Sequence, residues 1–410
     1  MSNASDFHIE NGVLLEYRGR DDVVTVPDGV NTIADYAFGS ACIAFRIVLP
    51  EGVTTIKAHA FPDCRRLETI TIPKSICTIG RGAFGNCLRL KKIEVHPENE
   101  HYVVKDGMLL SQDGKILLRF FAADTDVEYS IPDGITVIEP HAFQSAKKIK
   151  KLTVPSSVIS IGSGAFQDMP DLVEADFCGS LDAMEDGLFQ GCKRLKSIVW
   201  PNNLRTIGRN CFFESGLEDF SIPDTVEEIG SYAFAYIYTD KVVLPKKLKK
   251  LGSGVFFGFD ELFLPRINTF EVYDSVQTGI CSLVWDRGQA ESDTYMHTIV
   301  VRSADDGSVK FRVHMPAGDK VKVRETFISA WAKDKAAFDF KKTDAIFKDM
   351  SMYAKIDYLL DRLFCPDGIS DEMLSTLKRF ISRNSKKIHS HILENGCEED
   401  LKLLAPYGIT

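Results

Sequence analysis

The residues with the most obvious capacity for chemistry are ten cysteines and nine histidines. Cys64, Cys87 and Cys192 are each followed three residues later by a leucine, but no CxxC pair or dense cysteine framework is present. A structural zinc site needs four converging ligands, and no histidine pair lies beside these cysteines to complete one. The pattern therefore predicts reduced, buried thiols that recur with the fold, not a metal site or a disulfide scaffold.

The histidines do not form a recognisable catalytic or metal motif. His389 and His391 lie two positions apart on a predicted helix, where they point in different directions, and HExxH is absent. His59 and His141 each stand immediately before an Ala-Phe pair. This equivalence favours surface substitutions in a repeat over a functional role.

Two Gly-Ser-Gly segments, Gly162 to Gly164 and Gly252 to Gly254, superficially match a turn that carries a serine nucleophile. Both follow a core aliphatic residue at the same repeat position, which favours a structural turn. The phosphate-binding patterns GxxxxGK[ST] and GxGxxG are missing in any strand-to-helix context. No nucleophile, base and orienting residue occur together, so the sequence predicts neither an enzyme nor a cofactor site.

The composition and net charge of the chain indicate which classes of binding partner and which cellular location are expected. The 410 residues are 44% hydrophobic and 26% charged, as in ordinary globular proteins, and the net charge of −9 disfavours nucleic acid or an anionic membrane as the main partner. No apolar stretch is long enough to span a membrane, and the N-terminus lacks an export signal. The chain as given is therefore predicted to be cytoplasmic. If Ser2-Asn3-Ala4 replaces a native signal, the prediction becomes a cell-surface or secreted protein.

An internal repeat explains the arrangement of these residues. Anchors recur every 22 or 23 residues with one long interruption: Pro27, Pro50, Pro73, Pro132, Pro155, Cys178, Pro201, Pro223 and Pro245. Three residues after them come Val30, Val53, Ile76, Ile135, Val158, Leu181, Leu204, Val226 and Leu248. Six residues after them come Ile33, Ile56, Ile79, Ile138, Ile161, Met184, Ile207, Ile229 and Leu251. Eleven residues after them come Phe38, Phe61, Phe84, Phe143, Phe166, Phe189, Phe212, Phe234 and Phe256.

Such a repeat predicts a solenoid, in which each coil buries the same side chains against its neighbours. Residues 90–95, 149–154, 172–177 and 195–200 have apolar residues at alternating positions, so each is predicted to be a short strand. Stacked strands would form a parallel sheet along one face of the array. Phe177 and Trp200 fall in inward strand positions and are expected in the core. The cysteines Cys64, Cys87 and Cys192 lie fourteen residues after their anchors, and Cys42 fifteen.

The full pattern, IPxxVxxIGxxAFxxCxxLxxIxIP, is best seen from Ile72-Pro73 to Ile93 and resembles the BspA-like subfamily of leucine-rich repeats over roughly residues 7–265. Residues 102–110 resemble the hairpin insert of that family, and Phe7 to Tyr17 repeats the hairpin signature as an N-terminal cap. The expected fold class is an α/β repeat: a leucine-rich-repeat solenoid with short parallel strands, a β-hairpin cap and insert, and a C-terminal α-helical module. The resemblance implies adhesion or recognition of proteins, usually at a cell surface.

The C-terminal third departs from the repeat. After Phe270 to Trp285, residues 298–303 and 309–315 flank Asp305-Asp306-Gly307 and predict a hairpin, either a cap or a connector. From about Thr326 a helical pattern begins, with a stop at Pro366-Asp367-Gly368, helix starts at Ser370 and Ser385, and an end at Asn395-Gly396. Residues 387–409 resemble a degenerate ankyrin-type helix pair. The predicted division is a cap at 1–25, a solenoid at 26–265 with an insert at about 97–130, a β-rich segment at 266–325 and helices at 326–410.

The predicted function is a non-catalytic scaffold that binds a protein partner through the strand face of the array. The predicted partner-binding residues are the outward ones of successive strands: Glu68, Thr69, Thr71, Lys91, Lys92, Glu94, Lys150, Lys151, Thr153, Glu174, Asp176, Lys196, Glu218 and Asp219. Their mixed charges suit a protein of complementary pattern better than a polyanion. The alternative is a structural protein that self-associates. A third hypothesis places an unrecognised activity in the helical module.

Overall fold

The computed structural model describes residues 4–39, 43–122, 126–218, 220–237, 239, 241–256, 269–273, 297–315, 327, 330, 338–366, 368–395 and 398–407. The chain divides into two compact units. Unit 1 is Met1–Glu218 with Tyr232–Ile237, and unit 2 is Asp219–Ser231 with Tyr238–Thr410. The finer four-part division expected from the sequence stays a prediction.

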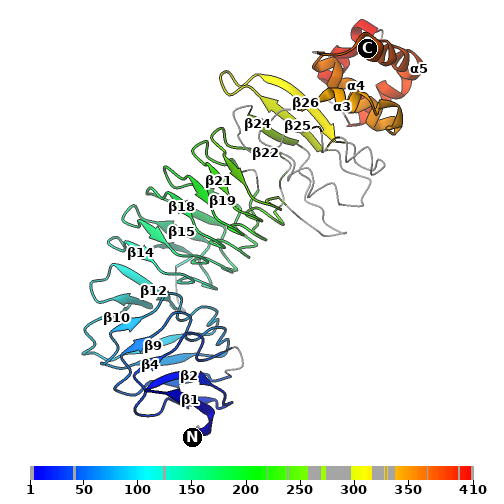
Figure 1. Ribbon diagram of the computed structural model, residues 1–410. Helices are drawn as coiled ribbons and strands as arrows, with labels where there is room; N and C mark the ends of the chain where they lie inside the picture. The colour runs from blue at the N-terminus through cyan, green and yellow to red at the C-terminus, as the bar shows by residue number, and fades with distance from the viewer. Residues whose placement is uncertain are drawn as a thin grey trace. The chain divides into compact units, whose positions relative to one another are not determined.

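Unit 1 begins with a 3-10 turn, η1 (Ala4–Asp6), and is otherwise made of short strands that recur with the repeat, lying one above another in Figure 1. They are β1 (Phe7–Glu10), β2 (Val13–Tyr17), β3 (Val23–Thr25), β4 (Thr32–Ile33), β5 (Arg46–Val48), β6 (Thr55–Ile56), β7 (Thr69–Ile72), β8 (Thr78–Ile79), β9 (Lys92–Val95), β10 (Tyr102–Lys105), β11 (Met108–Ser111), β12 (Ile116–Phe120), β13 (Glu128–Ser130), β14 (Val137–Ile138), β15 (Lys151–Val154), β16 (Ser160–Ile161), β17 (Glu174–Phe177), β18 (Ala183–Met184), β19 (Ser197–Val199) and β20 (Thr206–Ile207).

The repeating strands of unit 1 form two kinds of parallel sheet, one of longer and one of shorter strands. The longer strands form two sheets, β3-β5-β7-β9 and β13-β15-β17-β19. The two-residue strands β4, β6 and β8 follow the five-residue β2 in one sheet, and β14 and β16 follow the five-residue β12 in another. Antiparallel partners precede each sheet: β1 in the first case, and β10 with β11 in the second. The predicted hairpin cap and hairpin insert are therefore both present.

Stacked phenylalanine rings form the centre of the coils, as the eleven-residue offset predicts. All nine of these phenylalanines are buried. In unit 1 the phenylalanine rings form two stacks: in one, Tyr17 contacts Phe7 at 5.0 Å and Phe38 at 5.5 Å, and the other starts at Phe120, 4.6 Å from Phe143. Phe7 begins β1, Tyr17 ends β2 and Phe120 ends β12, so the cap and the insert each supply the first rings of a stack.

A buried arginine joins the two stacks of unit 1. Arg119, on β12, is 4% exposed, and its guanidinium donates hydrogen bonds to the carbonyl oxygens of Cys87, His141 and Gln144. The Asn86 amide nitrogen and the Gln144 Oε1 atom lie 2.7 Å apart, and the two side chains are also hydrogen-bonded. Arg119 supplies donors to three backbone carbonyls where the inserted hairpin interrupts the repeat, and Gln144 accepts from the Asn86 amide there, while Arg119 Nε is buried without a hydrogen-bond partner.

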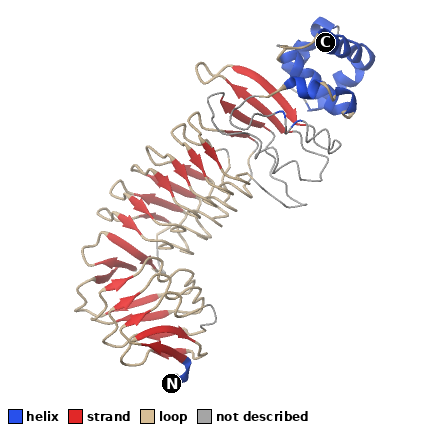
Figure 2. Cartoon of the chain, viewed as in Figure 1, coloured by secondary structure: helices blue, strands red, loops and turns tan. Residues whose placement is uncertain are grey.

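Unit 2 contains strands followed by helices, which are blue in Figure 2. They are β21 (Glu228–Ile229), β22 (Lys241–Val243), β23 (Lys250–Leu251), β24 (Thr269–Tyr273), β25 (His297–Arg302), β26 (Val309–Met315), α3 (Phe340–Asp344), η2 (Phe347–Asp349), α4 (Met352–Phe364), α5 (Asp371–Asn395), α6 (Glu398–Leu404) and η3 (Ala405–Tyr407). The sheet order is β22-β24-β25-β26, parallel except for the final hairpin.

The predicted elements of the C-terminal third agree with this structure where it is described. The hairpin around Asp305-Asp306-Gly307 is β25 and β26, and α4 packs on β26, so the hairpin both ends the sheet and connects it to the helices. The hydroxyl of Ser370 caps α5 by accepting a hydrogen bond from the Met373 amide at 3.1 Å. The backbone of α5 is non-helical at Asn384, directly before the predicted helix start. Residues 274–285 of the predicted β-rich run lie outside the described residues.

Candidate protein-interaction face

The outward side chains of the two longer-stranded sheets in unit 1 are the candidate binding surface. We call them the first strand face (β3, β5, β7, β9) and the second strand face (β13, β15, β17, β19). The sequence predicted one continuous face, but the structure forms two sheets, because the inserted hairpin lies between β9 and β13. This is a correction of the predicted surface.

The first strand face carries threonines beside charged residues. Thr69 is the register partner of Lys92, and Thr71 is the partner of Glu94. Lys92 Nζ lies 2.5 Å from the Glu94 carboxylate, and Arg46, on β5, lies 3.7 Å from it. The hydrogen bond from Lys92 lowers the pKa of Glu94 below its usual range, so this carboxylate is ionised at neutral pH.

The second strand face is organised around one lysine. Lys151 lies between Glu128 and Glu174 in the sheet register, and Thr153 pairs with Asp176. Lys151 Nζ is 3.3 Å from Glu174 and 3.0 Å from Asp176. Hydrogen bonds to Asp176 and then Glu174 raise the pKa of Lys151. The predicted basic stretch is therefore neutralised by the acidic residues that follow it.

The remaining predicted residues flank the strands. Glu68 and Lys91 form an ion pair at 3.2 Å just before β7 and β9. Lys196 and Glu218 form another at 3.3 Å. Lys150 is exposed just before β15. Asp219 lies outside the described residues.

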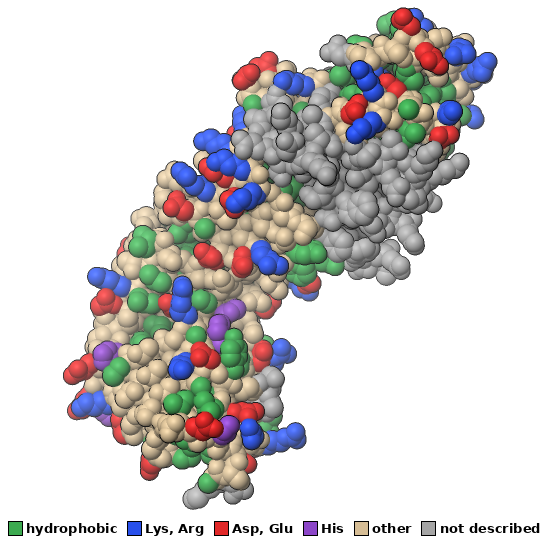
Figure 3. Space-filling model, viewed as in Figure 1, with side chains coloured by type: hydrophobic (Ala, Val, Ile, Leu, Met, Phe, Trp, Pro, Cys, Tyr) green, Lys and Arg blue, Asp and Glu red, His purple; other side chains and the backbone are tan. Residues whose placement is uncertain are grey.

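The charges on these faces are mixed in sign. In Figure 3, lysine and arginine side chains are interspersed with aspartate and glutamate over the visible coloured surface. Exposed ion pairs typically contribute only about 0–1 kcal/mol to folding stability. The ion pairs on the two strand faces therefore contribute little to the stability of the fold. Their fixed pattern of positive and negative charges suits recognition of a complementary surface.

Two aromatic residues expected in the core differ in position. Phe177 is 4% exposed, as predicted. Trp200 lies one residue beyond the end of β19, is half-buried, and packs edge-on against Phe212 at 5.5 Å between ring centroids. The prediction that Trp200 fills an inward strand position was wrong, because the strand ends at Val199.

The cysteine pattern is structural. The thiols of Cys64, Cys87 and Cys192 each contact a phenylalanine carbonyl 26 residues earlier, at 3.6, 3.4 and 3.1 Å. Burial raises the pKa of Cys192 to about 12, so this thiol is protonated and a poor nucleophile or metal ligand. Cys42 lies outside the described residues.

Unit 2 contains a group of buried charges that sequence reasoning missed. Asp361, on α4, is fully buried, accepts a hydrogen bond from the His314 amide at 2.6 Å, and lies 2.6 Å from His314 Nδ1. Arg312 contacts both Asp361 and Asp400 of α6. Since side chains alternate along β26, Arg312 and His314 share one face of the strand, and this pattern is the signal the sequence offered.

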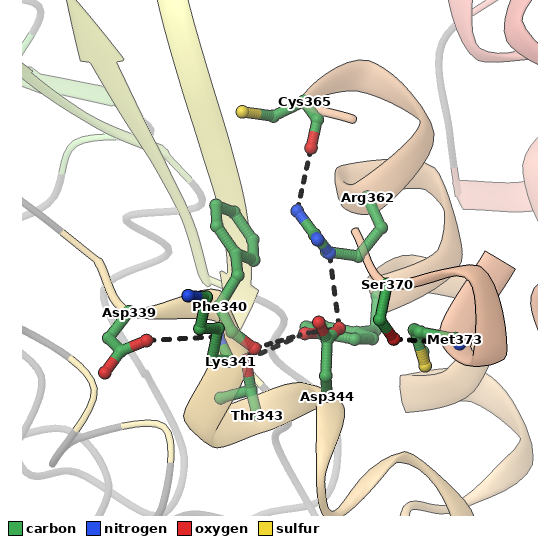
Figure 4. Close-up of polar contacts among 10 residues, drawn as sticks. Asp339, Phe340, Lys341, Thr343, Asp344, Arg362, Cys365, Ser370 and Met373 are labelled. Carbon is green, nitrogen blue, oxygen red and sulfur yellow. Dashed lines mark hydrogen bonds and ion pairs between the residues drawn. The ribbon is translucent and has the colours of Figure 1, made fainter. Parts of the chain in front are cut away.

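Two further polar contacts hold the helices together. One turn before Asp361, Asp357 lies 2.9 Å from His391 Nε2 of α5. Figure 4 shows the second, in which Asp344 accepts hydrogen bonds from Tyr358 Oη at 2.8 Å and Arg362 Nε at 3.2 Å. The Asp344 carboxylate has the opposite charge of the buried Arg362 beside it, as a structural ion pair requires.

The His314 pair predicts a pH dependence for unit 2. Burial alone would lower the pKa of His314, but the adjacent Asp361 charge outweighs it and raises the pKa. A histidine with a raised pKa in the folded state stabilises the fold fully below its unfolded pKa of about 6.5. This stability is lost as pH rises through the folded-state value. We therefore expect unit 2 to lose stability as pH rises above neutrality, measured by denaturant unfolding at successive pH values.

The control for this prediction is His314→Asn, which keeps a hydrogen-bonding side chain but cannot take up a proton in this range. Other titratable groups in the same contact, Asp361, Asp400, Asp357 and His391, are retained. The variant should lose the downward slope. An equal slope in both proteins would contradict the prediction.

The stacked coils, parallel strands and ring ladders define a leucine-rich-repeat solenoid. Six copies of the BspA type leucine rich repeat region match residues 22–106, 116–240 and 227–276. Since these residues make up more than half of the chain, it belongs to the BspA type leucine-rich repeat family.

Solved bacterial structures resemble the chain over part of its length. A leucine rich cell surface protein from Faecalibacterium prausnitzii is 34% identical, with 53% of this chain and 59% of that chain covered and a TM-score of 0.47. A leucine-rich repeat protein from Eubacterium ventriosum is 20% identical, with 60% and 87% covered and a TM-score of 0.43. This chain thus spans about three fifths of the Faecalibacterium protein. No curated protein matches the chain. Within the described residues, no helix is long and apolar enough to cross a membrane.

Proposed function

We propose that the chain is a non-catalytic scaffold that binds a protein partner through the first and second strand faces. The observation that carries this proposal is the fixed register of mixed charges on the second strand face, where Lys151 lies between two acidic residues. Membership of a repeat family whose members commonly bind proteins supports it. The proposal includes the absence of catalysis.

The proposed partner is a protein with an alternating charge pattern. A polyanion would meet Glu94, Glu174 and Asp176 along the same rows as the lysines, and like charges disfavour that approach. A protein surface can instead match each sign in turn. The proposed binding should therefore weaken as ionic strength rises, since exposed charges are screened by salt.

A binding experiment tests this proposal. The full chain is compared with a variant in which Lys91, Lys92, Lys150, Lys151, Glu174 and Asp176 are alanine, using affinity capture from source-cell material and then titration of the captured partner. We expect at least a tenfold loss of affinity in the variant. Circular dichroism should show both proteins folded, because these side chains lie outside the apolar core.

The matched control removes ion pairs that do not belong to either strand face. Lys74 with Glu98 and Lys193 with Glu214 are such pairs, at 2.7 and 3.3 Å. Their alanine variant should bind as the unchanged chain does. Equal binding by the strand-face variant would contradict the proposal, and growth of the apparent mass with concentration, in light scattering without partner, would favour self-association.

We also propose a cell-surface location, in line with the family and with the Faecalibacterium relative, which is a leucine rich cell surface protein. Protease treatment of intact source cells tests it. Digestion of the protein on intact cells supports the proposal, and protection until lysis supports the cytoplasmic alternative.

A further inference from the structure

The helix α5, labelled in Figure 1, carries a concentration of positive charge. Between Met373 and Leu393 it has five basic residues and no acidic one. We call these five exposed residues the α5 basic patch: Lys378, Arg379, Arg383, Lys386 and Lys387. The other residues of 326–410 include 8 basic and 13 acidic ones. The patch is therefore strongly positive within a segment whose remaining residues are net acidic.

The packing of α5 determines which side of the helix faces solvent. Its apolar side is buried in unit 2: Met373, Leu377, Ile381, Ile388 and Ile392. Phe380 also packs edge-on against Phe347, with 5.5 Å between ring centroids. On the exposed side, hydroxyls and guanidiniums recur three or four positions apart and so share one face: Ser375, Arg379, Ser382 and Arg383.

The basic patch has no acidic partner among the residues that the structure describes. Arg379 donates hydrogen bonds only within its own helix, to the Ser375 carbonyl at 3.3 Å and to Thr376 Oγ1 at 3.5 Å. On the strand faces of unit 1, by contrast, Lys92 and Lys151 lie 2.5 and 3.0 Å from carboxylates. The positive charges of α5 are therefore exposed and not neutralised by a described carboxylate.

Helix stability does not explain where these charges stand. Basic residues stabilise a helix in its last turn, next to the negative end of the helix dipole, but the last turn of α5 has none. Arg379 and Arg383 lie four positions apart, where like charges weaken a helix. The non-helical residue Asn384 lies inside the patch, and its Nδ2 atom donates a hydrogen bond to the Phe380 carbonyl at 2.9 Å. The backbone of the patch is therefore fixed, while its charges oppose the helix that carries them.

The surroundings of the patch favour a short acidic protein segment over a membrane or a nucleic acid. A helix that binds a membrane surface needs an outward apolar side, and the apolar side of α5 is buried. A nucleic acid that extended beyond the patch would meet the exposed Asp371 and Glu372 in the first turn of α5. From Lys378 to Lys387 the helix rises about 14 Å, which is the length of about four extended residues.

We propose that the α5 basic patch binds an acidic protein segment, in which about four successive residues are mainly aspartate or glutamate. The ammonium and guanidinium groups donate charge-assisted hydrogen bonds to the carboxylates of this segment. The hydroxyls of Ser375 and Ser382 lie on the same exposed side and supply further donors. This is a second protein-binding surface, in unit 2, and it does not depend on binding at the strand faces of unit 1.

Fluorescence anisotropy tests the proposal. A peptide with four consecutive glutamates and a neutral dye is titrated with the full chain at low ionic strength. The informative variant combines Arg379→Gln, Arg383→Gln and Lys386→Gln, because glutamine is uncharged and a good helix former. We expect at least a tenfold loss of affinity for the peptide. The melting temperature of this variant should be no lower than that of the unchanged chain, since like charges have been removed from the helix.

The control makes the same change of net charge at three exposed lysines outside the patch: Lys57→Gln, Lys105→Gln and Lys341→Gln. It should bind the peptide as the unchanged chain does. The proposal is overturned if the unchanged chain does not bind the peptide, if the two variants bind it equally, or if the patch variant melts at a lower temperature. Tighter binding of a thymidine oligonucleotide with four phosphates, or of phosphatidylserine vesicles, would also overturn it in favour of those partners.

Discussion

Replacement of Phe166 by alanine is expected to lower the free energy of unfolding by about 3–5 kcal/mol. Its ring is fully buried and lies between Phe143, at 5.6 Å, and Phe189, at 5.3 Å. The substitution leaves a cavity in the middle of the stack, and each neighbouring ring loses a contact surface. Since a domain is stable by only about 5–15 kcal/mol, this is a large fraction of the total. Urea unfolding followed by far-ultraviolet circular dichroism measures it.

Ile159→Ala is the matched control. Ile159 lies in the same coil but is 71% exposed, so its loss should change the free energy of unfolding by less than about 0.5 kcal/mol. Similar effects of the two substitutions would show that the coils do not stack with Phe166 inside.

The second large effect is expected in unit 2, where Asp361→Ala should cost about 3–5 kcal/mol. The carboxylate is fully buried, and removal leaves His314 and Arg312 without their shared anion. Arg312 retains Asp400, while His314 loses the acceptor beside Nδ1. Hydrogen exchange should therefore quicken at β26 and α4 before the rest of the chain.

Asp349→Ala provides the comparison for this prediction, because Asp349 is an exposed aspartate of the same unit. It should change stability by less than about 0.5 kcal/mol. Equal losses in the two variants, or faster exchange spread evenly over the chain, would contradict a local role for Asp361.

The repeat was predictable because each coil faces the same packing problem. A column such as Ile33, Ile56 and Ile79 must fill one interior site in successive coils, so its chemistry recurs at a fixed interval. The helix start at Ser370 was predictable for a similar reason, since capping depends on residues within one turn. Structural features that depend on neighbouring residues or on a regular repeat can therefore be predicted from a single sequence.

Contacts between segments far apart in the sequence could not be predicted in this way. In the sequence, nothing distinguishes Arg119 from other strand residues. In the structure, its guanidinium donates hydrogen bonds to the carbonyls of Cys87, His141 and Gln144. His59 and His141 were interpreted as separate surface substitutions, because nothing in their spacing shows that their ring centroids lie 6.5 Å apart, with the coil of Gly82 between them. The ion pairs among the predicted partner-binding residues could not be predicted for the same reason. The strand position of each residue follows from the repeat, but which residues pair depends on the register between neighbouring coils.

The hairpin that precedes each ring stack has a consequence for how unit 1 comes apart. In a linear array, loss of structure spreads from an uncovered end to the next coil, and each step exposes a fresh apolar edge. Here the second stack has its own starting ring, Phe120, and its own antiparallel strands, β10 and β11. Unfolding that spreads through the coils from the N-terminus therefore reaches a covered edge at the insertion. There Arg119 loses the Cys87 carbonyl and Gln144 loses Asn86, but Arg119 keeps the carbonyls of His141 and Gln144, and the rings behind it stay covered. The insertion therefore stops unfolding of the N-terminal coils from spreading directly to the coils that follow it.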